Sequence, residues 1–161
     1  EHQKPLIAQL REAGAIVEGD IDKVRVIGSG TLKGVSVKTL PYPGFPTDMQ
    51  AQIMAMMVVS EGNSKVTETV FENRFMHVEE LNRMGATITT ADRSANIEGP
   101  AKLVGCDVRA TDLRAGAAMI LAGLVAEGET RIGDLHHIDR GYEDIVEKLK
   151  NLGADIERVD V

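Results

Sequence analysis

The residues in this sequence best suited to chemistry are two aspartates and two arginines that recur at similar spacings, together with a third arginine. Asp48 and Asp112 lie 64 residues apart, and each follows a threonine at the expected start of an apolar helix. Arg74 and Arg140 lie 66 residues apart, each just after an expected strand, and Arg114 falls in the first turn of the second apolar helix. Guanidinium groups bind phosphate or carboxylate through paired hydrogen bonds, and helix N-termini add partial positive charge. The pattern therefore indicates a site for a small anionic molecule.

Ordinary structural roles explain the same residues, and the sequence leaves both interpretations open. An aspartate that follows a threonine at a helix start is a common N-cap, which stabilises the helix by about 1 kcal/mol. Arg74 and Arg140 could instead pair with Glu72 and Asp139 on the surface. Exposed ion pairs of this kind contribute about 0–1 kcal/mol to stability. Local residue types do not decide between the two interpretations.

An internal repeat sets the positions of these candidates. The segments LREAGAIV, LNRMGATI and LKNLGADI match one another around Gly14, Gly85 and Gly153. A second match joins SEGNSKVTE to AEGETRIGD at a similar spacing. The matches divide the chain into three parts of one lobe, namely a partial unit at 1–34 and complete units at 35–100 and 101–161.

Each complete unit is expected to follow the order strand, helix, strand, helix, strand, strand (βαβαββ). In the first complete unit, alternation and turn residues predict two strands, two helices and a closing hairpin. These elements are a strand at 35–40, a helix at about 48–61, a strand at 65–70, a helix at about 76–84, and hairpin strands at 86–91 and 94–99.

The two helices of a unit differ in a way that predicts the architecture. The first is apolar all round, as in QAQIMAMMVV and AGAAMILAGLVA, and a helix of this kind is buried on every side. The second is amphipathic, as in VEELNRMG and YEDIVEKLKNLG, and should lie outside a sheet. We therefore expect a mixed α/β (α+β) fold of pseudo-symmetric units, an incomplete inside-out α/β barrel (α-β prism) with apolar helices at its centre.

Charge and composition argue against several classes of partner. The 161 residues carry a net charge of −7, which disfavours a nucleic-acid or anionic-membrane surface. No apolar run is long enough to span a bilayer, and no signal segment opens the sequence. The single cysteine, Cys106, can form no internal disulfide and fits a reducing compartment. A cytoplasmic protein is therefore expected. No zinc-ligand spacing appears in the sequence, so no metal site is expected either.

Four longer strings carry a resemblance to a known family. They are PGFPTDMQAQ (43–52), TETVFENRFMHVEEL (67–81), ATDLRAG (110–116) and HIDRGYEDIVEKLKNLGADIERV (137–159). These strings closely resemble the UDP-N-acetylglucosamine 1-carboxyvinyltransferases, a family of enolpyruvyl transferases, and the match spans nearly the whole chain in order. The related enolpyruvylshikimate phosphate synthases share the fold but not these strings.

The resemblance implies a fold, a reaction and a set of partners. Proteins of this family have two lobes, each of three βαβαββ units, with the active site between the lobes. They transfer the enolpyruvyl group of phosphoenolpyruvate to the 3-hydroxyl of UDP-N-acetylglucosamine and release phosphate, in the first committed step of peptidoglycan synthesis. No metal or organic cofactor is implied. Without the N-terminal lobe we expect this chain to be inactive alone. The apolar surface exposed by a missing central helix predicts a homodimer or a rearranged pairing of units.

The resemblance also implies roles for individual residues. Asp48 corresponds to the carboxylate that contacts the sugar 3-hydroxyl and acts as the proposed general base. Val70 corresponds to a contact with the UDP-sugar, and Arg74 and Arg140 to arginines on the phosphoenolpyruvate side. Two further residues correspond to active-site positions with less direct roles, namely Asp112 and Arg114.

Two alternatives to this function stay open. The chain could belong to a binding or assembly module that keeps the fold without enzymatic activity. It could also belong to an enolpyruvyl transferase with a different acceptor. The family's cysteine proton donor lies in a loop of the other lobe, and Cys106 does not match that motif. Cys106 is therefore not expected to inherit the proton-donor role.

Overall fold

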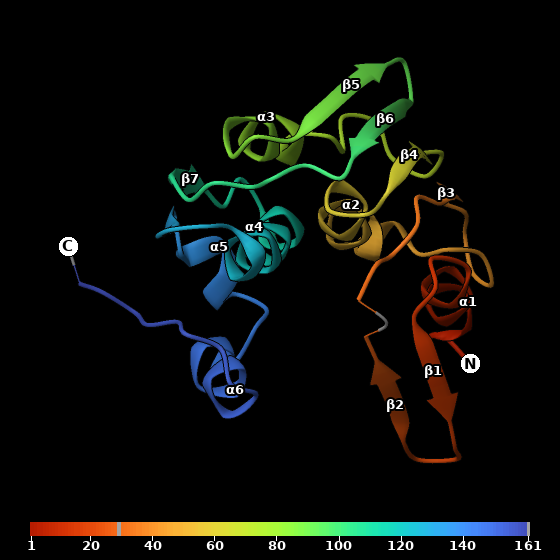
Figure 1. Ribbon diagram of the computed structural model, residues 1–161, viewed down its shortest axis with the longest axis horizontal. Coiled ribbons are helices and arrows are strands. Elements are labelled where there is room, and N and C mark those ends of the chain that lie inside the picture. The colour runs from red at the N-terminus through yellow and green to blue at the C-terminus, as the bar shows by residue number, and fades with distance from the viewer. Residues whose placement is uncertain (29, 161) are drawn as a thin grey trace.

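The computed structural model describes residues 1–28 and 30–160 and is shown in Figure 1. The N-terminal part consists of helix α1 (Lys4–Glu12) followed by a hairpin of β1 (Ile16–Gly19) and β2 (Val24–Ile27). The hairpin is antiparallel, with Val17 opposite Val26. These elements correspond to the second helix and the closing hairpin of a repeat unit.

The middle of the chain has the element order predicted from the repeat. Its four-stranded sheet has the order β3-β4-β6-β5, in which β3 and β4 are parallel and the other pairs antiparallel. The elements are β3 (Ser36–Lys38), the 3-10 turn η1 (Thr47–Met49), α2 (Gln50–Val58), β4 (Gly62–Thr67), α3 (His77–Arg83), β5 (Thr87–Ala91) and β6 (Ser94–Gly99). The helix predicted to start at Asp48 thus starts with a 3-10 turn and becomes α-helical at Gln50.

The last part begins in the same way but ends differently. It contains β7 (Asp107–Arg109), α4 (Leu113–Val125), β8 (Arg131–Gly133), α5 (His136–Asp139) and α6 (Ile145–Asn151), with β7 and β8 parallel. No strand follows α6 in the described residues 152–160. The expectation that 101–161 forms a complete βαβαββ unit is therefore wrong. Only eight residues follow Gly153 in the sequence, too few for two paired strands and a turn.

Three equivalent glycines confirm the repeat at the level of the backbone. Gly14, Gly85 and Gly153 follow α1, α3 and α6, and their φ angles are +106°, +113° and +98°. A residue with positive φ just after a helix redirects the chain and lets its last carbonyls accept hydrogen bonds, and glycine adopts this conformation without strain.

The two apolar helices lie side by side at the centre of the molecule, as predicted. Eight of the nine residues of α2 are buried, and α2 packs against α4 within a core that includes Met54, Met57 and Met119. In Figure 1 the sheet of β4, β5 and β6 and helix α3 lie outside this pair. The three sheets share no strands and no closed barrel forms among the described residues. The structure thus has the inside-out arrangement of an incomplete lobe.

Helix α4 is less completely buried than its sequence predicts. Six of its thirteen residues are buried, whereas Leu121, Leu124 and Val125 expose 42%, 40% and 58% of their surface. The side of α4 that carries these three residues is an apolar surface, which we call the outer face of α4. Its exposure agrees with the expectation that a central helix here lacks part of its packing.

Candidate active site

Asp48 lies in η1, at the start of the central helix α2. It stands two residues after Pro46, whose extended backbone leads the chain into the 3-10 turn. The side chain of Asp48 is 67% exposed and caps neither η1 nor α2. The N-cap interpretation of Asp48 is therefore wrong, and its carboxylate faces the arginines described next.

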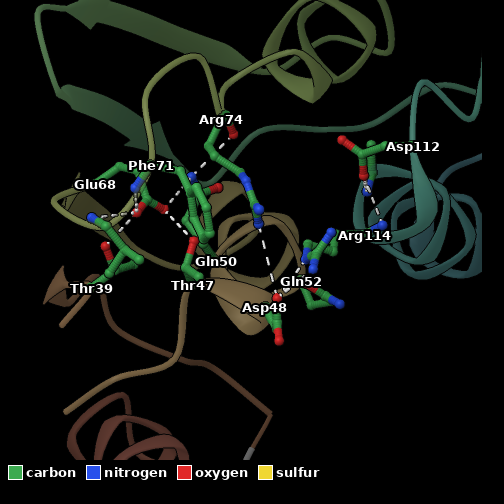
Figure 2. Close-up of polar contacts among 12 residues, drawn as sticks. Thr39, Thr47, Asp48, Gln50, Gln52, Glu68, Phe71, Arg74, Asp112 and Arg114 are labelled. Atoms are coloured by element: carbon green, nitrogen blue, oxygen red, sulfur yellow. Dashed lines mark hydrogen bonds and ion pairs between the residues drawn. The ribbon is translucent and has the colours of Figure 1, made fainter. Parts of the chain in front are cut away.

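Two arginines from different repeat units meet at the Asp48 carboxylate (Figure 2). Arg114, in the first turn of α4, places both Nε and Nη2 at 2.6 Å from Asp48 Oδ1. Arg74 approaches the same oxygen from the loop after β4, with Nη1 at 3.9 Å, an ion-pair distance too long for a hydrogen bond. Within the described residues no protein group donates to Asp48 Oδ2. We call Asp48, Arg74 and Arg114 the charged triad.

Asp112 has a different role from its repeat equivalent Asp48. It is the N-cap of α4, and its Oδ1 accepts hydrogen bonds from the backbone N–H groups of Arg114 at 2.8 Å and Ala115 at 2.9 Å. The structural interpretation is therefore correct for Asp112. By fixing the first turn of α4, this cap also sets where the Arg114 side chain begins.

Arg74 is held in place by three local features. Its guanidinium stacks over the ring of Phe71 at 4.0 Å from the ring centre, and its backbone carbonyl accepts a hydrogen bond of 3.1 Å from Gln50. Asn73, just before it, has a left-handed backbone with φ of +53°.

The side chain of Arg74 is only 20% exposed, and its Nη1 has no hydrogen-bond partner in the described part of the chain. A buried donor of this kind favours an anionic or polar ligand.

A buried glutamate that sequence reasoning missed joins the segments of this site. Glu68 is 1% exposed and accepts hydrogen bonds from five donors. The donors are Thr39 Oγ1 at 2.7 Å, Thr47 Oγ1 at 2.8 Å, Gln50 Nε2 at 3.3 Å, and the N–H groups of Val70 at 3.1 Å and Phe71 at 3.3 Å. Burial by itself would raise the pKa of Glu68, but the hydrogen bonds from Thr39, Thr47, Val70 and Phe71 outweigh it and hold the pKa below the ordinary value.

The structure brings together some of the predicted site residues and leaves others apart. Val70 is half-buried in the loop after β4 that also carries Arg74, and its backbone N–H donates a hydrogen bond to Glu68. Arg140 follows α5 and is exposed, and no hydrogen bond or ion pair of the described residues joins it to the charged triad.

A small recess between α2 and α4 lies behind the charged triad. It is lined by Thr47, Gln50, Ala51, Arg74, His77, Asp112, Arg114 and Ala115. His77 is buried, with Nε2 at 3.1 Å from the sulfur of Met54. Burial lowers the pKa of His77 to about 4, although the nearby Asp112 opposes this shift. His77 is therefore a neutral wall of the recess at pH 7.

Metal-ligand clusters and long apolar helices are both absent from the described residues. No group of three or more histidine, cysteine, aspartate or glutamate side chains there could hold a metal ion. None of the helices described is both long and apolar enough to cross a membrane.

Comparison with known proteins identifies the class to which this fold belongs. The sequence profile of the family described as EPSP synthase (3-phosphoshikimate 1-carboxyvinyltransferase) matches residues 2–149, so the chain belongs to this family of enolpyruvyl transferases. The crystal structure of the enolpyruvyl transferase NikO from Streptomyces tendae superposes with a TM-score of 0.88 at 34% identity, over 96% of this chain and 36% of that one. An EPSP synthase from Acinetobacter baumannii, at 20% identity and a TM-score of 0.66, shares the fold.

Within the family, the chain is similar to one particular group of enzymes. It is 60% identical to the UDP-N-acetylglucosamine 1-carboxyvinyltransferase of Finegoldia magna, 62% to one from Carboxydothermus hydrogenoformans and 56% to one from Staphylococcus aureus. In each case the match covers 99% of this chain and 38% of the relative. The chain thus spans about two-fifths of the length of these relatives, and the resemblance found in the sequence is confirmed.

Proposed function

We propose that this chain is part of an enzyme that transfers the enolpyruvyl group of phosphoenolpyruvate to the 3-hydroxyl of UDP-N-acetylglucosamine and releases phosphate. The observation that carries the proposal is the charged triad, in which Asp48 and two arginines from separate repeat units meet on an open face. Sequence identities of 56–62% to UDP-N-acetylglucosamine 1-carboxyvinyltransferases support the choice of UDP-N-acetylglucosamine as acceptor. In a cell this reaction would be the first committed step of peptidoglycan synthesis, carried out in the cytoplasm.

In the proposed reaction Asp48 acts as the general base. The sugar 3-hydroxyl loses its proton to Asp48 as its oxygen bonds to C2 of phosphoenolpyruvate, and C3 is protonated. Loss of a proton from C3 and departure of phosphate from C2 then restore the double bond. The Oδ2 atom suits this role, because Oδ1 is occupied by Arg114 while Oδ2 faces no donor among the described residues.

The arginines have two functions in this proposal. Arg114 orients the carboxylate through two short contacts, and Arg74 presents a partly buried guanidinium with a free donor to the anionic substrates. Val70 would contact the UDP-sugar beside them, and Asp112 would act by fixing the turn that carries Arg114. The reaction as proposed uses no metal or organic cofactor.

The remaining parts of the site would come from outside these residues. An N-terminal lobe with a cysteine-bearing loop would supply the proton donor and close over the charged triad. The exposed Arg140 would then face phosphoenolpyruvate from its side of the cleft. We infer that this chain alone would not turn over substrate.

The test is phosphate release by the full-length protein that contains this sequence. Phosphoenolpyruvate would be supplied with UDP-N-acetylglucosamine or, in a parallel reaction, with shikimate 3-phosphate. Release that depends on the UDP-sugar supports the proposal. Release with shikimate 3-phosphate alone would assign a different acceptor, and no release with either would favour a non-enzymatic module of the same fold.

A further inference from the structure

Glu68 is linked by hydrogen bonds to the two segments that carry Asp48 and Arg74. It lies just after β4, is 1% exposed, and accepts hydrogen bonds from three separate segments of the chain. We propose that Glu68 is a positioning residue that holds Asp48 and Arg74 in their relative places for the proposed reaction. This inference rests on the proposed function, and it adds a residue that does not itself face the substrates.

One set of contacts reaches Asp48. Thr47 donates to Glu68 Oε1 at 2.8 Å, and Thr47 is the residue immediately before Asp48 in η1. This hydrogen bond ties the 3-10 turn to the segment that follows β4 and so restrains the rotation of the turn. Asp48 then projects from the opposite side of the same turn toward the arginines (Figure 2).

A second set of contacts reaches Arg74. Gln50 uses its side-chain nitrogen to donate both to Glu68 Oε1 at 3.3 Å and to the Arg74 carbonyl at 3.1 Å. The N–H of Phe71 donates to Glu68 Oε2 at 3.3 Å, and the Phe71 ring supports the Arg74 guanidinium at 4.0 Å. Both the backbone and the side chain of Arg74 are therefore placed by groups that hydrogen-bond to Glu68.

The other repeat unit lacks this arrangement and provides a comparison within the molecule. Asp134 is the residue equivalent to Glu68, and it is exposed and pairs with Arg109 at 3.8 Å. Thr111, the equivalent of Thr47, has a buried hydroxyl with no partner in the described part of the chain. Among the described residues, this link is thus built in the unit that carries Asp48 and Arg74 and not in the unit that carries Arg114.

A carboxylate suits this position better than the amide of the same shape. All five groups around Glu68 are donors, so both oxygens must accept hydrogen bonds. A glutamine would direct its NH₂ group at one set of donors, which leaves buried donors without partners. Glu68→Gln is therefore a change of the same size that should release the turn or the Arg74 loop.

The experiment compares Glu68→Gln with Asp134→Asn in the full-length protein. Asparagine tolerates the left-handed backbone of Asp134, whose φ is +59°, so this control changes an equivalent carboxylate without strain. We expect Glu68→Gln to lower kcat/KM for UDP-N-acetylglucosamine by about 10- to 100-fold, as misplaced catalytic groups do. We also expect KM for this substrate to rise, and Asp134→Asn to change neither value.

The value of KM distinguishes misplaced catalytic groups from a smaller fraction of folded enzyme. If the variant only reduces the folded fraction, kcat per total protein falls while KM stays at the wild-type value, and the inference is overturned. Equal kcat/KM in Glu68→Gln and wild type overturns it too, while the proposed function stands. A wild-type protein without phosphate release would instead refute the proposed function.

A second variant keeps the test decisive if Glu68→Gln does not fold. Thr47→Val removes one donor to Glu68 and leaves the other four in place. It should lower kcat/KM by several-fold and combine with Glu68→Gln less than additively where both fold, because both changes break one hydrogen bond. Thr47→Val with wild-type kcat/KM would contradict the role of Glu68.

Discussion

At the scale of single residues, Asp48 and Asp112 have equivalent places in the repeat and different partners. Asp112 accepts hydrogen bonds from two backbone N–H groups of α4. Asp48, in the described part of the chain, accepts its hydrogen bond from a side-chain guanidinium group. The difference follows from the backbone, because α4 starts directly after Asp112 and α2 starts after a 3-10 turn that contains Asp48. One aspartate therefore stabilises a helix and the other is available for chemistry.

Removing the cap of α4 should cost stability. Asp112→Ala leaves the N–H groups of Arg114 and Ala115 without a side-chain acceptor, so we expect the free energy of unfolding to fall by about 0.5–2 kcal/mol. Asp112→Asn keeps an acceptor oxygen and should cost much less. Urea denaturation of the three proteins measures the difference. Equal losses for the two variants would show that the cap hydrogen bonds are not responsible.

His77 should make stability depend on pH. Burial lowers its pKa to about 4 from 6.5, so between these values the unfolded chain binds more protons than the folded chain. The stability it contributes is complete above pH 6.5 and is lost as pH falls toward 4. The slope of unfolding free energy against pH should reach about 1 kcal/mol per pH unit, and His77→Gln should remove it. Denaturation between pH 4.5 and 6.5 measures this slope, and identical slopes in both proteins would contradict the account.

Residue types predicted part of the site, and burial explains the rest. The sequence indicated Asp48, Arg74 and Arg114 through the repeat, and the structure places them together. Glu68 was not predicted, because a glutamate at the end of a strand looks like a surface residue until its five donors are placed around it. Its alignment with Asp134 in the repeat was the one available signal. Arg140, at the end of α5, is exposed, and its place on the phosphoenolpyruvate side stays a prediction.

At the scale of elements, close packing of α4 depends on a glycine. A Cβ on Gly116 would lie 2.6 Å from the side chain of Ile138 and 3.1 Å from that of Ala110. We expect Gly116→Ala to lower the free energy of unfolding by about 1–2 kcal/mol, because overpacking outweighs the gain in helix propensity.

Gly123 of the same helix provides the matched control. A Cβ there would lie 3.3 Å from the nearest atom, in the side chain of the partly buried Thr130. Gly123→Ala should therefore be close to neutral, because a small adjustment of Thr130 offsets part of the propensity gain. Thermal or urea denaturation compares the two variants. A Gly116→Ala protein as stable as Gly123→Ala would mean that α4 and α5 are not packed as described.

The order of elements was predictable, and their ends were less so. Apolar helices, amphipathic helices and glycine stops recur in the sequence, and local patterns of this kind determine helix and strand type. The final hairpin was expected because the repeat was carried through residue 161, but no strand partner exists for 154–160 in the described residues. The 3-10 turn at Asp48 also escaped prediction, since its Thr47 hydrogen-bonds to Glu68, a residue distant in the sequence that lies just after β4.

At the scale of the whole molecule, the outer face of α4 should drive self-association of this 161-residue chain. Leu121, Leu124 and Val125 are exposed on a helix whose composition is that of a buried one. We expect the isolated chain to form dimers or larger species in sedimentation velocity experiments, and Leu124→Lys to shift it toward monomer. Leu152→Lys, at a residue 83% exposed and outside this face, should leave association unchanged. A monomeric wild-type chain would contradict the prediction.

The central claim is that the charged triad is the catalytic half of an enolpyruvyl transfer site. The most direct measurement is single-turnover formation of enolpyruvyl-UDP-N-acetylglucosamine by the full-length protein, compared between wild type, Asp48→Asn and the Asp134→Asn control. Loss of the general base should slow Asp48→Asn by at least about 100-fold, while Asp134→Asn forms product at the wild-type rate. Product formation by Asp48→Asn at the wild-type rate would contradict the account.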